Sequence, residues 1–184
     1  MKKILTIVLL AIALTACGSK YKPDTSGFTE DYKNKEQAFL NDFKSKYNAA
    51  ENKDDKEKYA FEIGFRHMNL GDYDNAIKYY KIALDYNPIH FQALNNLAVI
   101  YEEMGEIEKA LKYEQQLYNK NTTNIEVVRD TIRLLAKNAQ FKDAQGVLET
   151  FMATDTGKVQ SNFFDEQMAS LKDIEADAIK RMNK

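Results

Sequence analysis

The chain of 184 residues has little of the material from which catalytic and metal sites are built. It holds two histidines, and their spacing resembles no zinc site. Its seven glycines form neither a GxGxxG motif nor a phosphate-binding loop. Its single cysteine cannot form an internal disulfide. These absences argue against an enzyme, and we expect no catalytic residue, no cofactor and no metal.

An excess of charge of one sign is also missing. Lys and Arg number 26 and Asp and Glu number 28, which gives a net charge of −2 spread along the chain. Nucleic-acid-binding domains carry a clustered basic surface. We therefore expect no nucleic-acid partner. Beyond Ala16 no apolar run is long enough to cross a membrane.

The first residues form a short basic head, Met1-Lys2-Lys3, followed by an apolar run from Ile4 to Ala16. A basic head with an apolar core of this length is typical of a signal peptide, which we assign to residues 1–16. The run ends in Leu14-Thr15-Ala16-Cys17. This ending resembles a bacterial lipobox, and the alternative is an ordinary secretory signal with an incidental cysteine.

The lipobox resemblance implies that Cys17 is acylated and becomes the anchor. Residues 17–27 then form the lipidated cysteine and a flexible tether, with the membrane contacted through the N-terminal lipid. The implied location is exported and lipid-anchored. In a cell with two membranes it is the outer membrane facing the periplasm, and otherwise the outer face of the cell membrane.

A 34-residue period runs through the centre of the chain, where Ala76, Ala110 and Ala144 are equally spaced. Repeats of this length are typical of helical hairpins that stack to share one core. Other positions keep the same step: Gly71, Gly105 and Ala139; Tyr73, Ile107 and Phe141; Gly64, Ala98 and Ile132; Ala83, Leu117 and Phe151.

These positions resemble the tetratricopeptide repeat (TPR) family. The resemblance implies an all-α, right-handed superhelix of about three helix-turn-helix repeats, at 57–90, 91–124 and, in degenerate form, 125–158. Gly71 and Gly105 fall where the chain reverses, which favours the left-handed conformation of glycine. Pro88 closes the first unit, and Glu114 stands where the family has an aromatic residue.

The repeats have helical flanks. Residues 28–56 carry an amphipathic helix over 28–50, and residues 159–184 carry a capping helix over 162–182. Thr123 and Glu126 have the spacing of a capping box, which predicts a helix start close to 124. A dimer interface is the alternative role for the C-terminal helix.

In the TPR family the first helix of each unit lines the concave surface. The resemblance therefore implies eight protein-binding residues, which are Phe61, Phe65, Met68, Asn95, Val99, Glu102, Arg129 and Arg133. The groove would be apolar at one end and cationic at the other, which suits a partner segment with apolar side chains and a carboxylate. The family's carboxylate clamp is not supported, because Phe61 and Phe65 replace its lysine and asparagine.

Two alternatives to this groove stay open. The helix at 28–50 could cover Phe61 and Phe65, and the arginines could pair with acids such as Asp173 and Glu175. Of the two histidines, we expect His67 to pack and His90 to lie exposed in a loop between units.

We interpret the protein as a membrane-anchored adaptor that binds a protein or peptide segment in the bacterial cell envelope. Similar lipoproteins assist pilus or secretin assembly, outer-membrane protein insertion or the regulation of cell-wall enzymes. The alternative is a structural, self-associating repeat protein, such as a homodimer, whose groove is filled by its own helices.

Overall fold

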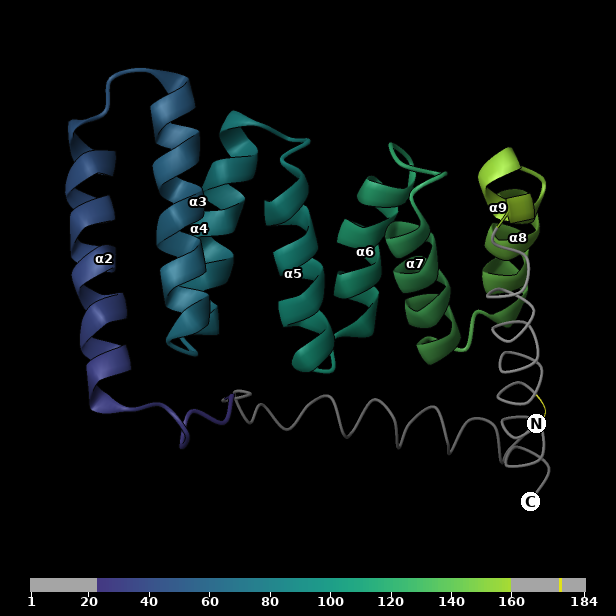
Figure 1. Cartoon of the computed structure of the whole chain (residues 1–184), viewed down its shortest axis with the longest axis horizontal. Coiled ribbons are helices and arrows are strands. Elements are labelled where there is room, and N and C mark those ends of the chain that lie inside the picture. The colour runs from purple at the N-terminus through teal and green to yellow at the C-terminus, as the bar shows by residue number, and fades with distance from the viewer. Residues whose placement is uncertain (1–22, 160–175, 177–184) are drawn as a thin grey trace, which may run out of the picture.

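The computed structural model describes residues 23–159 and residue 176. All regular structure in that part of the chain is helical, and the helices stand side by side in a row (Figure 1). Their bounds are α2 Glu30–Ala49, α3 Lys53–Asn69, α4 Tyr73–Tyr86, α5 Phe91–Glu103, α6 Ile107–Tyr118, α7 Ile125–Lys137, α8 Phe141–Met152 and α9 Asp155–Val159. The predicted all-α class is confirmed.

The helices pack as three consecutive hairpins, α3 with α4, α5 with α6 and α7 with α8. We call these hairpins the first, second and third units. Neighbouring units meet where α4 contacts α5 and where α6 contacts α7, which we call the first and second junctions. One hydrophobic core runs through all three units, because each hairpin shares its apolar face with the next.

The turn inside each unit needs a residue in the left-handed backbone region. Gly71 and Gly105 adopt φ values of 73° and 75°, so the predicted role of these glycines is confirmed. Ala139 holds the third turn with a φ of 57° although it carries a Cβ. The turn geometry of the repeat is therefore kept in the third unit at some cost in backbone strain.

A glycine within α3 makes room for a buried tyrosine of α4. A Cβ built on Gly64 would lie 2.8 Å from Cδ1 of Tyr80, whose side chain is fully buried. One repeat step further, Ala98 and Glu114 occupy the two positions, and Ile132 and Leu148 follow in the third unit. The smallest first-position residue, Gly64, thus accompanies the largest second-position residue, Tyr80, and the other two units pair a larger first residue with a smaller second one.

The N-terminal helix α2 docks on α3 through Arg66. The guanidinium lies 5.0 Å from the ring centroid of Phe39 and 5.7 Å from that of Phe43, and it forms an ion pair with Glu36 at 3.3 Å. Cation–π contacts strengthen when they are partly desolvated, as they are here. The amphipathic pattern at 28–50 therefore corresponds to a helix that covers the N-terminal end of the stack.

Two helix boundaries show what the local sequence encodes. Helix α7 begins after Asn124, whose side chain accepts hydrogen bonds from the amides of Glu126 and Val127. The predicted helix start is thus in place, but the cap is Asn124 and not Thr123. Helix α4 ends at Tyr86, two residues before Pro88. The predicted signal peptide and Cys17 lie outside the described residues, as does the helix at 162–182 apart from residue 176.

Candidate protein-binding site

The eight predicted binding residues come from the first helix of each unit. Phe61, Phe65 and Met68 lie on α3, Asn95, Val99 and Glu102 on α5, and Arg129 and Arg133 on α7. Because the sets are related by the 34-residue step, they share one surface, which we call the first-helix face. The two arginines are exposed and the other six residues are half-buried.

The α3 end of this face is aromatic. Phe61 stacks on Phe65 with ring centroids 6.3 Å apart and on His90 at 4.7 Å. His90 caps α5, because its Nδ1 accepts a hydrogen bond from the Ala93 amide at 3.3 Å. Its side chain is only 13% exposed, so the prediction of an exposed loop histidine is wrong. The histidine instead extends the aromatic surface from α3 to α5.

The contacts of α2 fall on another strip of α3. Phe43 lies 6.4 Å from Tyr59, and Glu36 accepts a hydrogen bond from Asn69 at 3.1 Å. Arg66 stands between Phe39 and Phe65, with its guanidinium 5.0 Å from each ring centroid. These contacts lie to one side of Phe61, and they argue against α2 as the occupant of the first-helix face.

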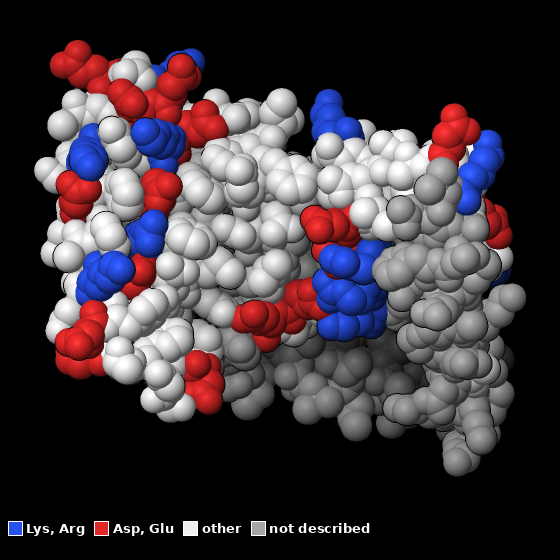
Figure 2. Space-filling view, viewed as in Figure 1, with Lys and Arg blue, Asp and Glu red and all other residues white. Residues whose placement is uncertain are grey.

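The middle of the face is polar but uncharged. Asn96 donates a hydrogen bond to the Tyr80 hydroxyl at 2.9 Å, and that hydroxyl donates to the Met68 sulfur at 3.6 Å. Burial raises the pKa of Tyr80, and the hydrogen bond from Asn96 opposes this effect only in part. Figure 2 shows a broad area without charged side chains between the charged N-terminal helices and a compact group of charges further along the stack.

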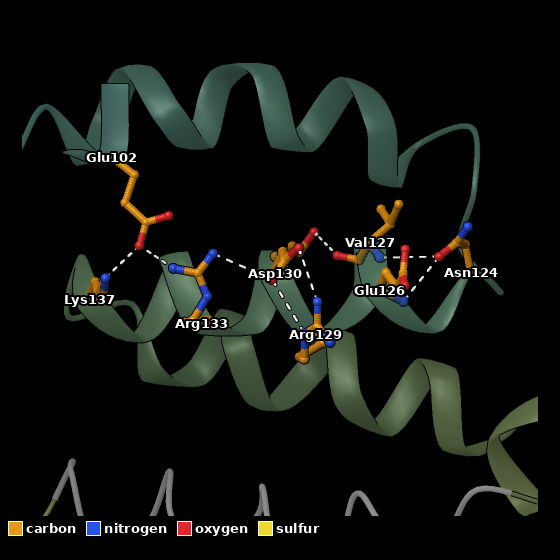
Figure 3. A network of polar contacts seen from close by, with 9 residues as sticks. Glu102, Asn124, Glu126, Val127, Arg129, Asp130, Arg133 and Lys137 are labelled. Carbon is orange, nitrogen blue, oxygen red and sulfur yellow. Dashed lines mark hydrogen bonds and ion pairs between the residues drawn. The ribbon is translucent and has the colours of Figure 1, made fainter. Parts of the chain in front are cut away.

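The α7 end of the face carries an ion-pair network (Figure 3). Glu102 reaches across from α5 and binds both Arg133 and Lys137. Asp130 lies 3.4 Å from Arg129 and 3.4 Å from Arg133. Burial acts to raise the pKa of Glu102, but the hydrogen bonds from Arg133 and Lys137 outweigh it and lower that pKa. Acids of α5 and α7 thus accompany both arginines, while Asp173 and Glu175 lie outside the described residues.

A further carboxyl, Glu114 on α6, lies beneath this network. Its residue is 2% exposed. Burial, together with the nearby charge of Asp130, raises the pKa of Glu114 to about 7. Glu114 and Asp130 follow Tyr80 and Asn96 by one repeat step each. The sequence analysis noted that Glu114 replaces an aromatic residue but did not predict that this acid is buried. The replacement of Asn96 by Asp130 one repeat step later could have indicated that two acids meet at this junction.

The described residues hold no group of three or more His, Cys, Asp or Glu side chains that could bind a metal ion. No helix in the same part of the chain combines the length and the apolar character needed to cross a bilayer.

The stacked hairpins, their left-handed turns and their small-residue contacts define a tetratricopeptide repeat domain. The family model of the tetratricopeptide repeat matches residues 62–124. Residues 62–124 therefore match the TPR family, and the predicted all-α TPR superhelix is confirmed.

Among curated proteins, the chain is 32% identical over 117 residues to the photosystem I assembly protein Ycf3 of Rippkaea orientalis, which covers 62% of each chain. It is 48% identical over 52 residues to the protein of the same name from Cyanophora paradoxa, which covers 28% of this chain and 30% of that relative. The uncharacterized protein ycf37 of Pyropia yezoensis is 41% identical over 61 residues, which covers 33% of this chain and 32% of that relative. The chain thus spans 62% or less of the length of these relatives.

Two predictions from the sequence are wrong in the light of these relatives. They are the function of a membrane-anchored adaptor in the bacterial cell envelope and the exported, lipid-anchored location. The similar proteins are named for photosystem I assembly and not for an envelope process. Both predictions depended on residues 1–17, which lie outside the described part. The acylation of Cys17 stays a prediction.

Proposed function

We propose that the TPR domain is a non-catalytic, protein-binding module that holds a segment of a partner protein on the first-helix face. The observation that carries this proposal is the chemistry of that face. An aromatic, uncharged stretch on α3 and α5 continues into a cluster of exposed cations on α7. Aromatic residues and arginine are the side chains that contribute most to protein interfaces.

The face favours a segment with apolar side chains followed by a carboxylate. Phe61, Phe65 and Val99 offer half-buried apolar surface to such a segment. Arg129 is the cation best placed for the carboxylate, because its side chain is 45% exposed and its ion pair is with the adjacent Asp130 at 3.4 Å. A planar guanidinium binds carboxylates through two parallel hydrogen bonds.

We further propose that the bound segment belongs to a subunit of a multisubunit complex and is held during assembly. The support is the name of the relatives, which are photosystem I assembly proteins.

Photo-crosslinking in living cells tests the proposal. A benzoylphenylalanine probe replaces Phe65, and a matched probe replaces Gln116, which is exposed on α6 outside the first-helix face. We expect the probe at 65 to link to one short segment of another protein and the probe at 116 to give no such product. Links only to a second copy of this chain would overturn the proposal in favour of self-association.

A charge change then tests the carboxylate end. Arg129→Gln should reduce the yield of the crosslink at position 65 by up to about fivefold, the value of one exposed charge pair. Lys120→Gln removes an exposed cation outside the first-helix face and serves as the control. Equal yields from the two variants would exclude Arg129 as a contact.

A further inference from the structure

The second junction buries the carboxyl of Glu114 and the hydroxyl of Thr131. The Thr131 hydroxyl donates a hydrogen bond to the Val127 carbonyl at 2.8 Å. Glu114 is 2% exposed and lies near the same hydroxyl, which would lower the pKa of Glu114 if it donated to the carboxylate instead. A hydroxyl has one hydrogen to donate. While that hydrogen bonds Val127, Glu114 can bond Thr131 only as a protonated donor.

The charged groups around Glu114 act in two directions, because Asp130 and Glu102 raise the pKa of Glu114 whereas Arg133 lowers it. Asp130 and Arg133 approach from α7, and Glu102 approaches from α5. Arg133 already serves Glu102 and Asp130, so an ionised Glu114 would be a third carboxylate around one shared guanidinium. An incompletely compensated buried charge is unfavourable, and the protein relieves it by binding a proton or by admitting water.

We infer that Glu114 is a proton-operated latch: protonated, it closes the second junction, and ionised, it loosens the packing of the third unit on the second. Ionisation turns the Thr131 hydroxyl away from Val127 and towards the carboxylate. It also adds a negative charge beside Asp130. Both effects weaken the contact of α7 with α6, which is the contact that keeps Glu114 from water.

The latch also affects the first-helix face, and this consequence rests on the function proposed above. Arg133 belongs both to the surroundings of Glu114 and to the cationic end of that face. Ionisation of Glu114 lowers the positive potential at that end. The affinity for an acidic segment is therefore higher when Glu114 is protonated. By linkage, binding of such a segment raises the pKa of Glu114.

Hydrogen exchange of the full chain tests the latch without any partner. We would measure the protection factors of the α7 amides at about pH 6 and about pH 8, with the amides of α3 as an internal reference. The pKa of Glu114 is near 7 in the closed junction and should return to its ordinary value when α7 opens. Rising pH therefore favours the opened state, and we expect the protection of α7 to be about tenfold lower at about pH 8 than at about pH 6. The protection of α3 should change much less.

Two variants complete the design. Glu114→Gln keeps the shape and the donor of the protonated acid but cannot ionise, so its α7 protection should be independent of pH. Glu108→Gln changes an exposed acid on the same helix and should behave as the wild type. Equal protection of wild-type α7 at both pH values, or a tenfold change that persists in Glu114→Gln, would overturn the latch.

A direct measurement keeps the inference testable if Glu114→Gln fails to fold. The side-chain carboxyl carbon of Glu114 in the wild-type chain should titrate by NMR with a midpoint near 7. A midpoint near the ordinary value for glutamate would overturn the latch. Because no partner is present in these measurements, they leave the crosslinking test of the proposed function independent.

Discussion

The first and second junctions join helices at equivalent positions of the repeat, but the side chains that meet there differ in chemistry. At the first, Tyr80 on α4 meets Asn96 on α5, and the contact is a neutral hydrogen bond of 2.9 Å. At the second, the equivalent positions hold the two acids Glu114 on α6 and Asp130 on α7. The repeat therefore fixes where helices meet but leaves open which forces hold them.

This difference predicts different responses to the solvent. The Tyr80–Asn96 contact of the first junction joins two groups that are neutral near pH 7. The second junction depends on a buried carboxyl and on partly exposed ion pairs, which respond to pH and to salt. The Tyr80–Asn96 contact should therefore respond less to pH and salt than the contact of Glu114 with α7.

The largest effect should come from breaking the first junction. Tyr80→Ala removes a fully buried ring and should lower the free energy of unfolding by about 3–5 kcal/mol. Urea unfolding followed by circular dichroism measures this change. Tyr86→Ala is the control, because Tyr86 lies on the same helix and is 36% exposed, and it should cost about 1 kcal/mol. Equal losses in both variants would show that Tyr80 has no special role at the junction.

The next effect concerns the second junction and depends on pH. The pKa of Glu114 in the folded chain is raised to about 7, so the protonated group stabilises the fold in full below its ordinary value of about 4.5. That stabilisation is lost as the pH rises towards and through 7. Glu114→Gln should therefore unfold at higher urea than the wild type at about pH 8, by about 3 kcal/mol. The difference should vanish as the pH falls towards about 4.5, and a difference independent of pH would exclude ionisation as its cause.

The next prediction tests the close packing of Gly64 against the Tyr80 ring, with Gly146 as the control. Gly64→Ala places a Cβ 2.8 Å from the Tyr80 ring and should destabilise the chain by about 1 kcal/mol, because the clash exceeds the gain in helix propensity. Gly146→Ala in α8 meets nothing within 4 Å and should stabilise by up to about 1 kcal/mol. Thermal unfolding of both variants gives the two signs. A stabilising Gly64→Ala would contradict the close contact.

The smallest effect concerns the ion pairs. Glu102→Gln removes the shared partner of Arg133 and Lys137, whose side chains are 42% and 49% exposed. We expect a loss of at most about 1 kcal/mol at low salt, which shrinks at about 1 M salt. Urea unfolding at both salt concentrations, with Glu108→Gln as the reference, measures it. A loss that is unchanged by salt would show that the contribution is not electrostatic.

The sequence predicted what depends on local spacing. The 34-residue step predicted the helical hairpins, and Gly71 and Gly105 predicted the left-handed turns. These features follow from backbone geometry that each unit must satisfy for itself. The cap of α7 was displaced by one residue because Thr123 and Asn124 can both accept hydrogen bonds from the first turn, and only the path of the preceding loop decides between them.

The pairing of side chains across units could not be predicted in the same way. Glu102 meets Arg133 over 31 residues, and its choice among the acids and bases nearby depends on how two helices are rotated against each other. The predicted exposure of His90 was wrong for a related reason. A loop position in the sequence does not reveal that the loop folds back onto Phe61.

The exchange of size between the two helices of a unit limits how these repeats can be recombined. Gly64 accommodates Tyr80, whereas Ile132 stands at the same step in the unit whose second helix offers Leu148. A chimera that moved α4 alone into the third unit would bring a tyrosine against an isoleucine. Exchange of a whole hairpin keeps the matched residues together, whereas exchange of a single helix separates them.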